Sequence, residues 1–428
     1  MRKIVFFIGW LTTLAHAGVK IDHWVAPSGA RVYFVETHAL PILDVAIDFT
    51  AGTAYDPMGK AGLAGLTRGL LDAGAGALDE ETIAEQLVNL GAQLSGTTDH
   101  DRAGLSLRTL ATTREKEAAL ILLRTVLSQP NFPDSVLTRE KARMIAALQE
   151  SDTRPDAIAA KRFSQEIYPN HPYGRTTTVA SMGSLTRDDL LTFHRTRYRA
   201  NRAVVALIGD VTRAEAERIA QFLTESLPTG EANDDLPPVQ MPVKHTVNIA
   251  HPAAQSHIHI GMPAISRLDP DYYALLVGNY TLGGGGFVSR LVSEVREKRG
   301  YAYSVYSYFS PRRFEGPFQI GLQTKREQAA EAIKLVESVL TDFVKTGPTA
   351  KELAAAQKNL INGQSLRIDS NAKLLGYLSA IGFYGLPLTY LDDFPAKIKA
   401  VTVDQVRAAF VRQVKPEHRV TVVVATDE

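Results

Sequence analysis

Arg296 and Tyr303 are the two residues whose types and spacing best suit chemistry on a peptide bond. They lie seven positions apart (303 − 296) in the segment REKRGYAY, after a glycine run at 283–286 and a Ser-Arg-Leu step at 289–291. A guanidinium and a phenol hydroxyl both donate hydrogen bonds to a carbonyl oxygen and stabilise negative charge that develops on it. The pattern predicts Arg296 near a helix end and Tyr303 near a strand start, so both side chains can reach one point. The alternatives are a surface arginine beside a half-buried tyrosine without a role, and Tyr301 as a competing tyrosine.

This layout resembles the pitrilysin/insulinase-type zinc peptidases, the inverzincins, in which an Arg and a Tyr of this kind grip the substrate. Their zinc helix carries H-x-x-E-H, whose two histidines bind zinc while the glutamate activates the metal-bound water. The corresponding stretch here is Gly65-x-x-Arg68-Gly69. The glycines have no ligand atoms, Arg68 is permanently positive, and the family's remaining zinc glutamate falls at or near Ala147. The resemblance therefore implies a degenerate motif and no metal in this chain.

Two sets of glycines accompany these motifs. Gly65 and Gly69 each cost roughly 1 kcal/mol relative to alanine inside a helix, so they do not serve helix stability. They either leave room for something to approach or record drift. The resemblance implies that Gly283, Gly284 and Gly285 border the bound substrate. No Lys-Ser/Thr follows that run, so we expect a turn and not a phosphate-binding loop.

Other candidate sites are weaker. His257 and His259 share one face of an expected strand, but a third metal ligand at suitable spacing is absent, which favours a solvated strand face. The segment at 99–101, Asp-His-Asp, follows a strand expected at 91–98 and is interpreted as a polar loop. No G-x-S-x-G motif and no cysteine exist to act as nucleophile.

A proline-rich segment divides the chain. Residues 227–244 contain four prolines together with Gly, Asn and Asp, and proline disfavours helix in the residue before it. The sequence therefore predicts an N-terminal domain at 18–226 with the degenerate zinc motif, a linker at 227–244, and a C-terminal domain at 245–428 carrying the Arg/Tyr pair.

The two halves resemble each other in sequence. Residues 185–210 align without a gap to residues 402–427 at an offset of 217, which pairs Phe193 with Phe410 (410 − 193). Each copy has the pattern of an amphipathic helix, a short turn and an apolar strand, and the repeat predicts a duplicated domain.

Clusters of strands and helices set the expected fold class. Strands are expected at 31–36 and 43–49, and helices at 114–127 and 136–149, without strict alternation of the two. This arrangement favours an α+β fold of two duplicated domains, each a mainly antiparallel sheet with helices packed on one face. The resemblance implies the same processing-peptidase-like fold.

Length, charge and the N-terminus limit the remaining classes. A chain of 428 residues is too long for one ordinary core, and a net charge of +1 does not suggest a nucleic-acid partner. Residues 1–17 have a basic start, a short apolar stretch and a small-x-small cleavage site, which predicts a signal peptide cleaved before Gly18. No later segment is apolar enough to span a membrane. We therefore expect an exported, periplasmic protein.

The resemblance and the lost ligands together predict a zinc-free subunit of a heteromeric peptidase. A homologous partner with an intact H-x-x-E-H would supply the zinc, and this chain would supply Arg296 and Tyr303 for a peptide substrate. The chain alone would be inactive. The alternative is a non-catalytic peptide-binding or scaffold protein of the same fold. A stand-alone zinc peptidase is disfavoured by the missing ligands, and homodimer and heterodimer both remain open.

Overall fold

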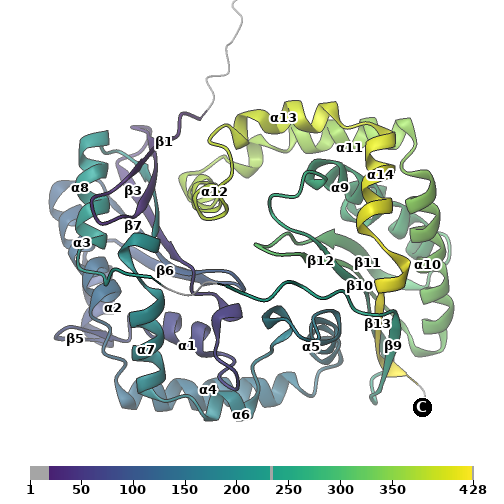
Figure 1. Ribbon diagram of the computed structural model, residues 1–428, viewed down its shortest axis with the longest axis horizontal. Helices are drawn as coiled ribbons and strands as arrows, with labels where there is room; N and C mark the ends of the chain where they lie inside the picture. Colours follow the sequence, from purple (N-terminus) through teal and green to yellow (C-terminus); the bar gives the residue numbers. More distant parts are fainter. Residues whose placement is uncertain (1–18, 232–234, 427–428) are drawn as a thin grey trace, which may run out of the picture.

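The computed structural model of the protein describes residues 19–231 and 235–426. The predicted signal peptide at 1–17 therefore lies outside the described residues. Two large β-sheets, one built from each half of the chain, lie on opposite sides of the molecule (Figure 1). A small third sheet pairs β4 (Gly74–Ala75) with β5 (Leu78–Asp79).

The first large sheet has the strand order β1-β2-β8-β3-β7-β6. Its strands are β1 (Asp22–Val25), β2 (Arg31–Glu36), β3 (Ile42–Phe49), β6 (Gln93–Thr98), β7 (Ala103–Leu110) and β8 (Val204–Gly209). Only the β2–β8 pair is parallel among these described strands. Every residue of β8 is buried, as its unbroken apolar run VVALIG demands of a strand covered on both faces, whereas the polar β6 forms an edge.

The second large sheet has the order β11-β12-β10-β13-β9. Its strands are β9 (His245–Ala250), β10 (Gln255–Ile265), β11 (Ala302–Phe309), β12 (Gly316–Lys325) and β13 (Val420–Thr426). The order repeats that of the first sheet, β6-β7-β3-β8-β2, and the parallel pair β13–β9 stands where β8–β2 stands. The α+β fold with two mainly antiparallel sheets is therefore confirmed.

The duplicated helix and strand are present, but the predicted offset of 217 is wrong by one residue. Thr186 caps α7 (Arg187–Arg197) and Thr402 caps α14 (Val403–Gln413), both through capping boxes, and they lie 216 residues apart (402 − 186). The strands that follow, β8 and β13, also begin 216 residues apart (420 − 204). Matching letters such as Phe193 and Phe410 set the sequence register, whereas caps and burial set the structural one.

Most helices lie on the outer faces of the two sheets (Figure 1). In the first half, α3 packs on β7 and α8 on β2; in the second, α10 packs on β12 and α14. The helices not yet bounded are α1 (Leu63–Gly69), α2 (Glu80–Asn89), α3 (Thr113–Ser128), α4 (Asp134–Ser151), α5 (Pro155–Ile167), α6 (Val179–Gly183), α8 (Arg213–Thr224), α9 (Tyr272–Asn279), α10 (Ala329–Thr346), α11 (Ala350–Asn362), α12 (Asn371–Tyr384) and α13 (Tyr390–Ala400).

Two helices are exchanged between the halves. Helix α12 of the second half packs on β8, β3 and β2 of the first sheet, and α5 of the first half packs on β13 and β10 of the second sheet. Both helices lie in the middle of the molecule, between the two sheets (Figure 1). Each sheet thus has its own helices on one face and a borrowed helix on the other.

Close apolar packing holds α12 in place. Leu374, Leu378 and Ile381 are buried against Val204 and its neighbours on β8. Each such side chain contributes about 1.5–3 kcal/mol when fully buried. Gly382 allows the approach, because a Cβ there would lie 2.5 Å from a methyl group of Val204. Two of the three apolar clusters therefore contain residues of both halves: one joins α12 to the first sheet, and the other joins β13 to the first half.

The described residues between α8 and β9 form neither helix nor strand. Helix α8 ends at Thr224 and β9 begins at His245, so the segment between them spans the predicted linker. The predicted domain boundaries at 226 and 245 stay a prediction. Within the described ranges, no helix has the length and apolarity needed to cross a membrane.

Candidate functional site

Arg296 and Tyr303 lie next to each other. Arg296 belongs to a π-helical turn, η6 (Val292–Glu297), and Tyr303 to the edge strand β11. The Arg296 Cζ atom lies 5.1 Å from the centre of the Tyr303 ring and 4.9 Å from that of Phe287. A guanidinium held between ring faces keeps its N–H donors for other partners. The predicted proximity is confirmed, and the catalytic role of the pair stays a prediction.

The structure separates Tyr303 from the competing Tyr301. Tyr301 is partly buried and packs against the core of the second half, whereas Tyr303 is 79% exposed. A bulge between Ala302 and Ser304 interrupts the pairing of β11 with β12. Because a bulge redirects a side chain, Tyr303 points outward where regular alternation would not place it.

The glycine run is a tightly packed turn. A second π-helical turn, η4 (Tyr280–Gly284), follows α9, and such turns are frequent at functional sites. A Cβ on Gly283 would lie 2.5 Å from the Ser307 hydroxyl, and one on Gly285 would lie 2.6 Å from the Tyr280 carbonyl oxygen. The expected turn is therefore present, and packing alone explains the glycine at these positions. Their role in substrate binding stays a prediction.

Polar contacts fix this turn to β11 and to the core. The Asn279 amide donates to the Ser307 carbonyl at 3.0 Å, and the Ser307 hydroxyl donates to the Asn279 oxygen at 2.7 Å. Arg290, of the Ser-Arg-Leu step, donates to both carboxylate oxygens of Glu352 at 2.8 and 2.7 Å. That hydrogen bond to Arg290 lowers the Glu352 pKa to about 2. The motif thus holds the turn beside Arg296 in a defined position.

A pocket of about 350 Å³ opens beside the pair. Gly284, Phe287, Arg296, Ser304 and Tyr306 are among the residues that line it. The pocket combines aromatic rings, exposed backbone beside glycine and one cation, which suits an extended peptide segment with its carbonyl groups.

The residues of α1 do not fit a zinc ion. Gly65 and Gly69 contribute no side chain, and a Cβ on either would meet nothing within 4 Å. Ala147 lies on the exposed side of α4. No group of three or more His, Cys, Asp or Glu residues among the described ranges has a metal-binding arrangement. The open space at the two glycines fits both predicted alternatives, room for an approaching group and drift.

Arg68 turns inward and lies against the edge strand β6. A Cβ on Gly96 would lie 2.4 Å from the Arg68 Nε atom, so the side chain occupies the space that this glycine leaves. Nε is buried and has no hydrogen-bond partner. The positive charge of Arg68 also acts on the buried Tyr198, whose pKa burial raises. Arg68 is therefore a packing residue where the family resemblance places a catalytic glutamate.

The Asp56 carboxylate stabilises the N-terminus of α1. Its two carboxylate oxygens accept hydrogen bonds from the backbone N–H groups of Gly62 and Ala64, both at 2.7 Å. Burial raises the Asp56 pKa to about 6, and these hydrogen bonds oppose that rise. A carboxylate at a helix N-terminus satisfies N–H groups that otherwise lack partners.

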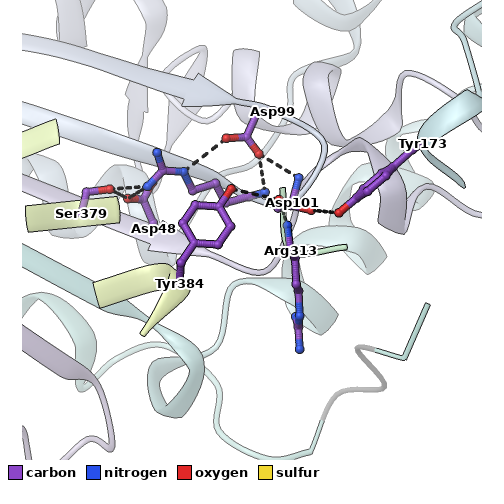
Figure 2. A network of polar contacts seen from close by, with 8 residues as sticks. Asp48, Asp99, Asp101, Tyr173, Arg313, Ser379 and Tyr384 are labelled. Carbon is purple, nitrogen blue, oxygen red and sulfur yellow. Dashed lines mark hydrogen bonds and ion pairs between the residues drawn. The ribbon is translucent and has the colours of Figure 1, made fainter. Parts of the chain in front are cut away.

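A buried polar network joins the two halves (Figure 2). Residues 99–101 form the expected polar loop between β6 and β7, but Asp101 at its end is buried, which the sequence did not predict. Asp101 is 1% exposed. It accepts hydrogen bonds from the Tyr173 hydroxyl, from the Tyr384 hydroxyl at 2.9 Å and from the Arg313 backbone N–H at 2.9 Å. Burial raises the pKa of both tyrosines, so both remain hydrogen-bond donors.

A second buried carboxylate continues the network. Asp48 on β3 accepts from Arg102 at 3.3 Å and from the Ser379 hydroxyl of α12 (Figure 2). Burial raises the Asp48 pKa, whereas the charge of Arg102 lowers it. No sequence motif marks these partners, because they are up to 331 positions apart.

The expected solvated face around His257 and His259 is also wrong. Helix α5 covers this part of β10, and the His259 ring lies 5.6 Å from that of Phe163. Its Nδ1 atom contacts the Gln319 amide nitrogen at 2.6 Å. Burial lowers the His259 pKa to about 4, so this partly buried ring is neutral near pH 7.

Two protein-family models match the chain. The model described as Insulinase (Peptidase family M16) matches residues 31–181, and that described as Peptidase M16 inactive domain matches residues 184–360. A relative from Helicobacter pylori, named "Non-peptidase homolog YmxG", is 27% identical over 382 residues, which are 88% of this chain and 87% of that protein.

Solved structures agree with this result. A crystal structure of the peptidase M16 inactive domain from Pseudomonas fluorescens is 37% identical, with a TM-score of 0.91 over 96% of this chain and 98% of its own. The periplasmic protease PqqL of Escherichia coli has the same fold at 18% identity, with a TM-score of 0.81 over 95% of this chain and 45% of PqqL.

Proposed function

Because the chain belongs to the peptidase M16 family, we propose that it is the zinc-free subunit of a heteromeric peptidase of that family. A homologous partner with an intact H-x-x-E-H supplies the zinc and the catalytic glutamate. This chain supplies Arg296 and Tyr303 to the same peptide substrate. The relative named a non-peptidase homolog supports the more general part of this proposal, that the chain is an M16 protein without a zinc site.

One observation carries the proposal. The chain holds an accessible, stacked Arg296–Tyr303 pair beside a pocket, while its own α1 offers Gly65, Arg68 and Gly69 where zinc chemistry needs ligands and a base. An exposed aromatic ring on an edge strand and a cation in the neighbouring turn η6 contribute little to folding, which favours a role in binding.

The chemistry follows from the two side chains. Zinc in the partner would polarise the peptide carbonyl and activate water. Arg296 and Tyr303 donate hydrogen bonds to the carbonyl oxygen and to its developing negative charge. Since both groups are already placed by η6 and β11, little reorganisation accompanies substrate binding.

Mixing this chain with a zinc-bearing homologue from the same organism tests the proposal. We expect peptide hydrolysis to rise on mixing. The Arg296→Ala and Tyr303→Phe variants should each lose about 10²-fold or more of that gain, the scale for removing one oxyanion donor. Arg299→Ala and Tyr301→Phe serve as matched controls three and two positions away. The absence of any gain with the unaltered chain would overturn the proposal.

The second candidate is a non-catalytic peptide-binding or scaffold protein. The pocket beside the exposed rings of Phe287 and Tyr303 favours it, since peptide binding needs no zinc. In that case a labelled peptide binds the isolated chain, and no homologous partner gains activity from either the unaltered chain or its Arg296→Ala variant.

The periplasm is the proposed location. It rests on the sequence pattern of residues 1–17. Cell fractionation with N-terminal sequencing checks it: the mature chain should begin at Gly18, and an intact Met1 terminus in the cytoplasmic fraction would refute it.

A further inference from the structure

A second pocket, of about 490 Å³, lies at the junction of the two halves. The first half contributes Arg31 and Arg202 to its lining, and the second contributes Arg267 and Arg313. The hydroxyl of Ser266 and the amide of Asn201 add further polar groups, and none of the described lining residues is acidic. The pocket therefore brings arginines of both halves together. Arg202 already has another interaction partner, which leaves Arg31, Arg267 and Arg313 as the candidate cations for a ligand.

The backbone fixes these arginines where the halves meet. Arg31 begins β2 and Arg202 ends a short helical turn, η3 (Ala200–Arg202), just before β8. Arg267 follows β10, and Arg313 lies between β11 and β12. Arg31, Arg202 and Arg267 thus lie next to strand ends, and Arg313 lies in the short connection between β11 and β12.

The partners of Arg267 and Arg313 are neutral aromatic groups. The Arg267 Cζ atom lies 5.6 Å from the Tyr272 ring and 5.8 Å from the Tyr384 ring. Arg313 donates from Nη1 to the Tyr55 hydroxyl at 3.1 Å. Neither contact neutralises the cation, so both guanidinium groups keep their charge and most of their donors for a ligand.

Two buried carboxylates near this junction, Asp101 and Asp48, already have hydrogen-bond partners. Asp101 accepts from Tyr173, Tyr384 and the Arg313 backbone, and Asp48 accepts from Arg102 and Ser379 (Figure 2). Tyr384 contributes to both places, since it lines the pocket and binds Asp101. Like charges that face one another across a shared space repel, and an anion between them removes that repulsion.

We propose that this pocket binds a small anion with two or more carboxylate or phosphate groups, which bridges the two halves. Guanidinium groups match both oxyanions with paired hydrogen bonds. The volume lies within the range of ordinary small-molecule sites. Because the ligand contacts strand ends of both sheets, its binding stabilises their relative arrangement. This site needs neither the partner peptidase nor the Arg296–Tyr303 pair.

Calorimetric titration of the full mature chain with pyrophosphate, and separately with citrate, at 150 mM salt tests the inference. We expect about one anion per chain. A stronger pyrophosphate response identifies phosphate as the recognised group, and a stronger citrate response identifies carboxylate. Arg31→Gln and Arg267→Gln should each raise Kd at least about tenfold, the loss of one charged hydrogen-bonding group.

Arg143→Gln is the matched control, since Arg143 lies exposed on α4 and pairs with Glu140. Thermal unfolding without anion verifies that each variant is folded. If Arg267→Gln destabilises the fold by removing the ring contacts of Arg267, the Arg31→Gln variant still tests the pocket. No saturable binding to the unaltered chain, or equal Kd values for the pocket variants and the Arg143→Gln control, would overturn the proposal.

Discussion

The two edge strands, β6 and β11, occupy the same place in the two sheets, yet the arginine beside each is used differently. Arg68 of α1 is tucked against β6 in the space left by Gly96. Arg296 of η6 lies beside β11 between two exposed aromatic rings. A duplicated fold therefore supplies two equivalent edges, and the inward or outward direction of one side chain separates a packed edge from an accessible one.

The largest effect is expected at Gly96. Alanine there would place a Cβ 2.3 Å from the Gly104 carbonyl oxygen and 2.4 Å from Arg68. The backbone at Gly104 can move away only at a high energetic cost. Gly96→Ala should therefore lower the free energy of unfolding by about 2–4 kcal/mol in urea titrations. A loss below about 1 kcal/mol would show that β6 is not packed on Arg68 as described.

Lowering the pH should reduce the folding stability of both halves. Burial lowers the pKa of His194 in the first half and His259 in the second to about 4, while the unfolded value is about 6.5. Between these values the unfolded chain binds more protons, so stability present above pH 6.5 is lost as pH falls toward 4. Each histidine contributes on the order of 2 kcal/mol.

Urea unfolding at pH 7 and pH 4.5 measures this dependence. His194→Gln and His259→Gln remove one titrating group each and should flatten it by similar amounts. A variant whose pH dependence equals that of the unaltered chain would contradict the buried, neutral state of that histidine.

The two arginines provide the most direct comparison. Arg68→Ala removes packing under β6 and should cost about 1–2 kcal/mol of unfolding free energy. Arg296→Ala removes only ring contacts at a partly exposed site and should cost less than about 1 kcal/mol. Chemical denaturation of both variants checks this. Equal losses would mean that Arg296, too, mainly supports the fold.

The smallest effect is a gain at Gly65. A Cβ there meets nothing within 4 Å, and its φ is not among the positive ones. Gly65→Ala should therefore raise the unfolding free energy by up to about 1 kcal/mol through helix propensity. A decrease in the thermal midpoint would instead indicate that the open space beside α1 is not available to a methyl group.

Local patterns made much of this molecule predictable. Apolar runs and turn residues gave the strands and the α+β class, and the seven-residue spacing placed Arg296 beside Tyr303. The absence of zinc ligands at Gly65 and Gly69 needed only residue identities. These features depend on neighbours within a few positions.

What could not be predicted depends on distant neighbours. Asp101 has the composition of a surface loop, but its partners Tyr384 and Arg313 are 283 and 212 positions away. The apolar face of α5 indicates that this helix packs against another element, but it does not identify the sheet. The contact between α5 and the strand that carries His259 was therefore not predicted. The predicted repeat register was wrong because more identical residues align at the offset of 217, such as Phe193 with Phe410, than at the structural offset of 216.

The exchange of α5 and α12 affects how the chain can reach its native state. The face of the first sheet that α12 covers stays open until residues 371–384 exist, long after β8 has been made. Contacts of such sequence separation slow folding and leave apolar strands exposed in the meantime. A fragment that stops before residue 371 would lack α12, the helix that covers this face of the first sheet, and should aggregate. The halves repeat each other in sequence, but each needs a helix from the other half to cover one face of its sheet.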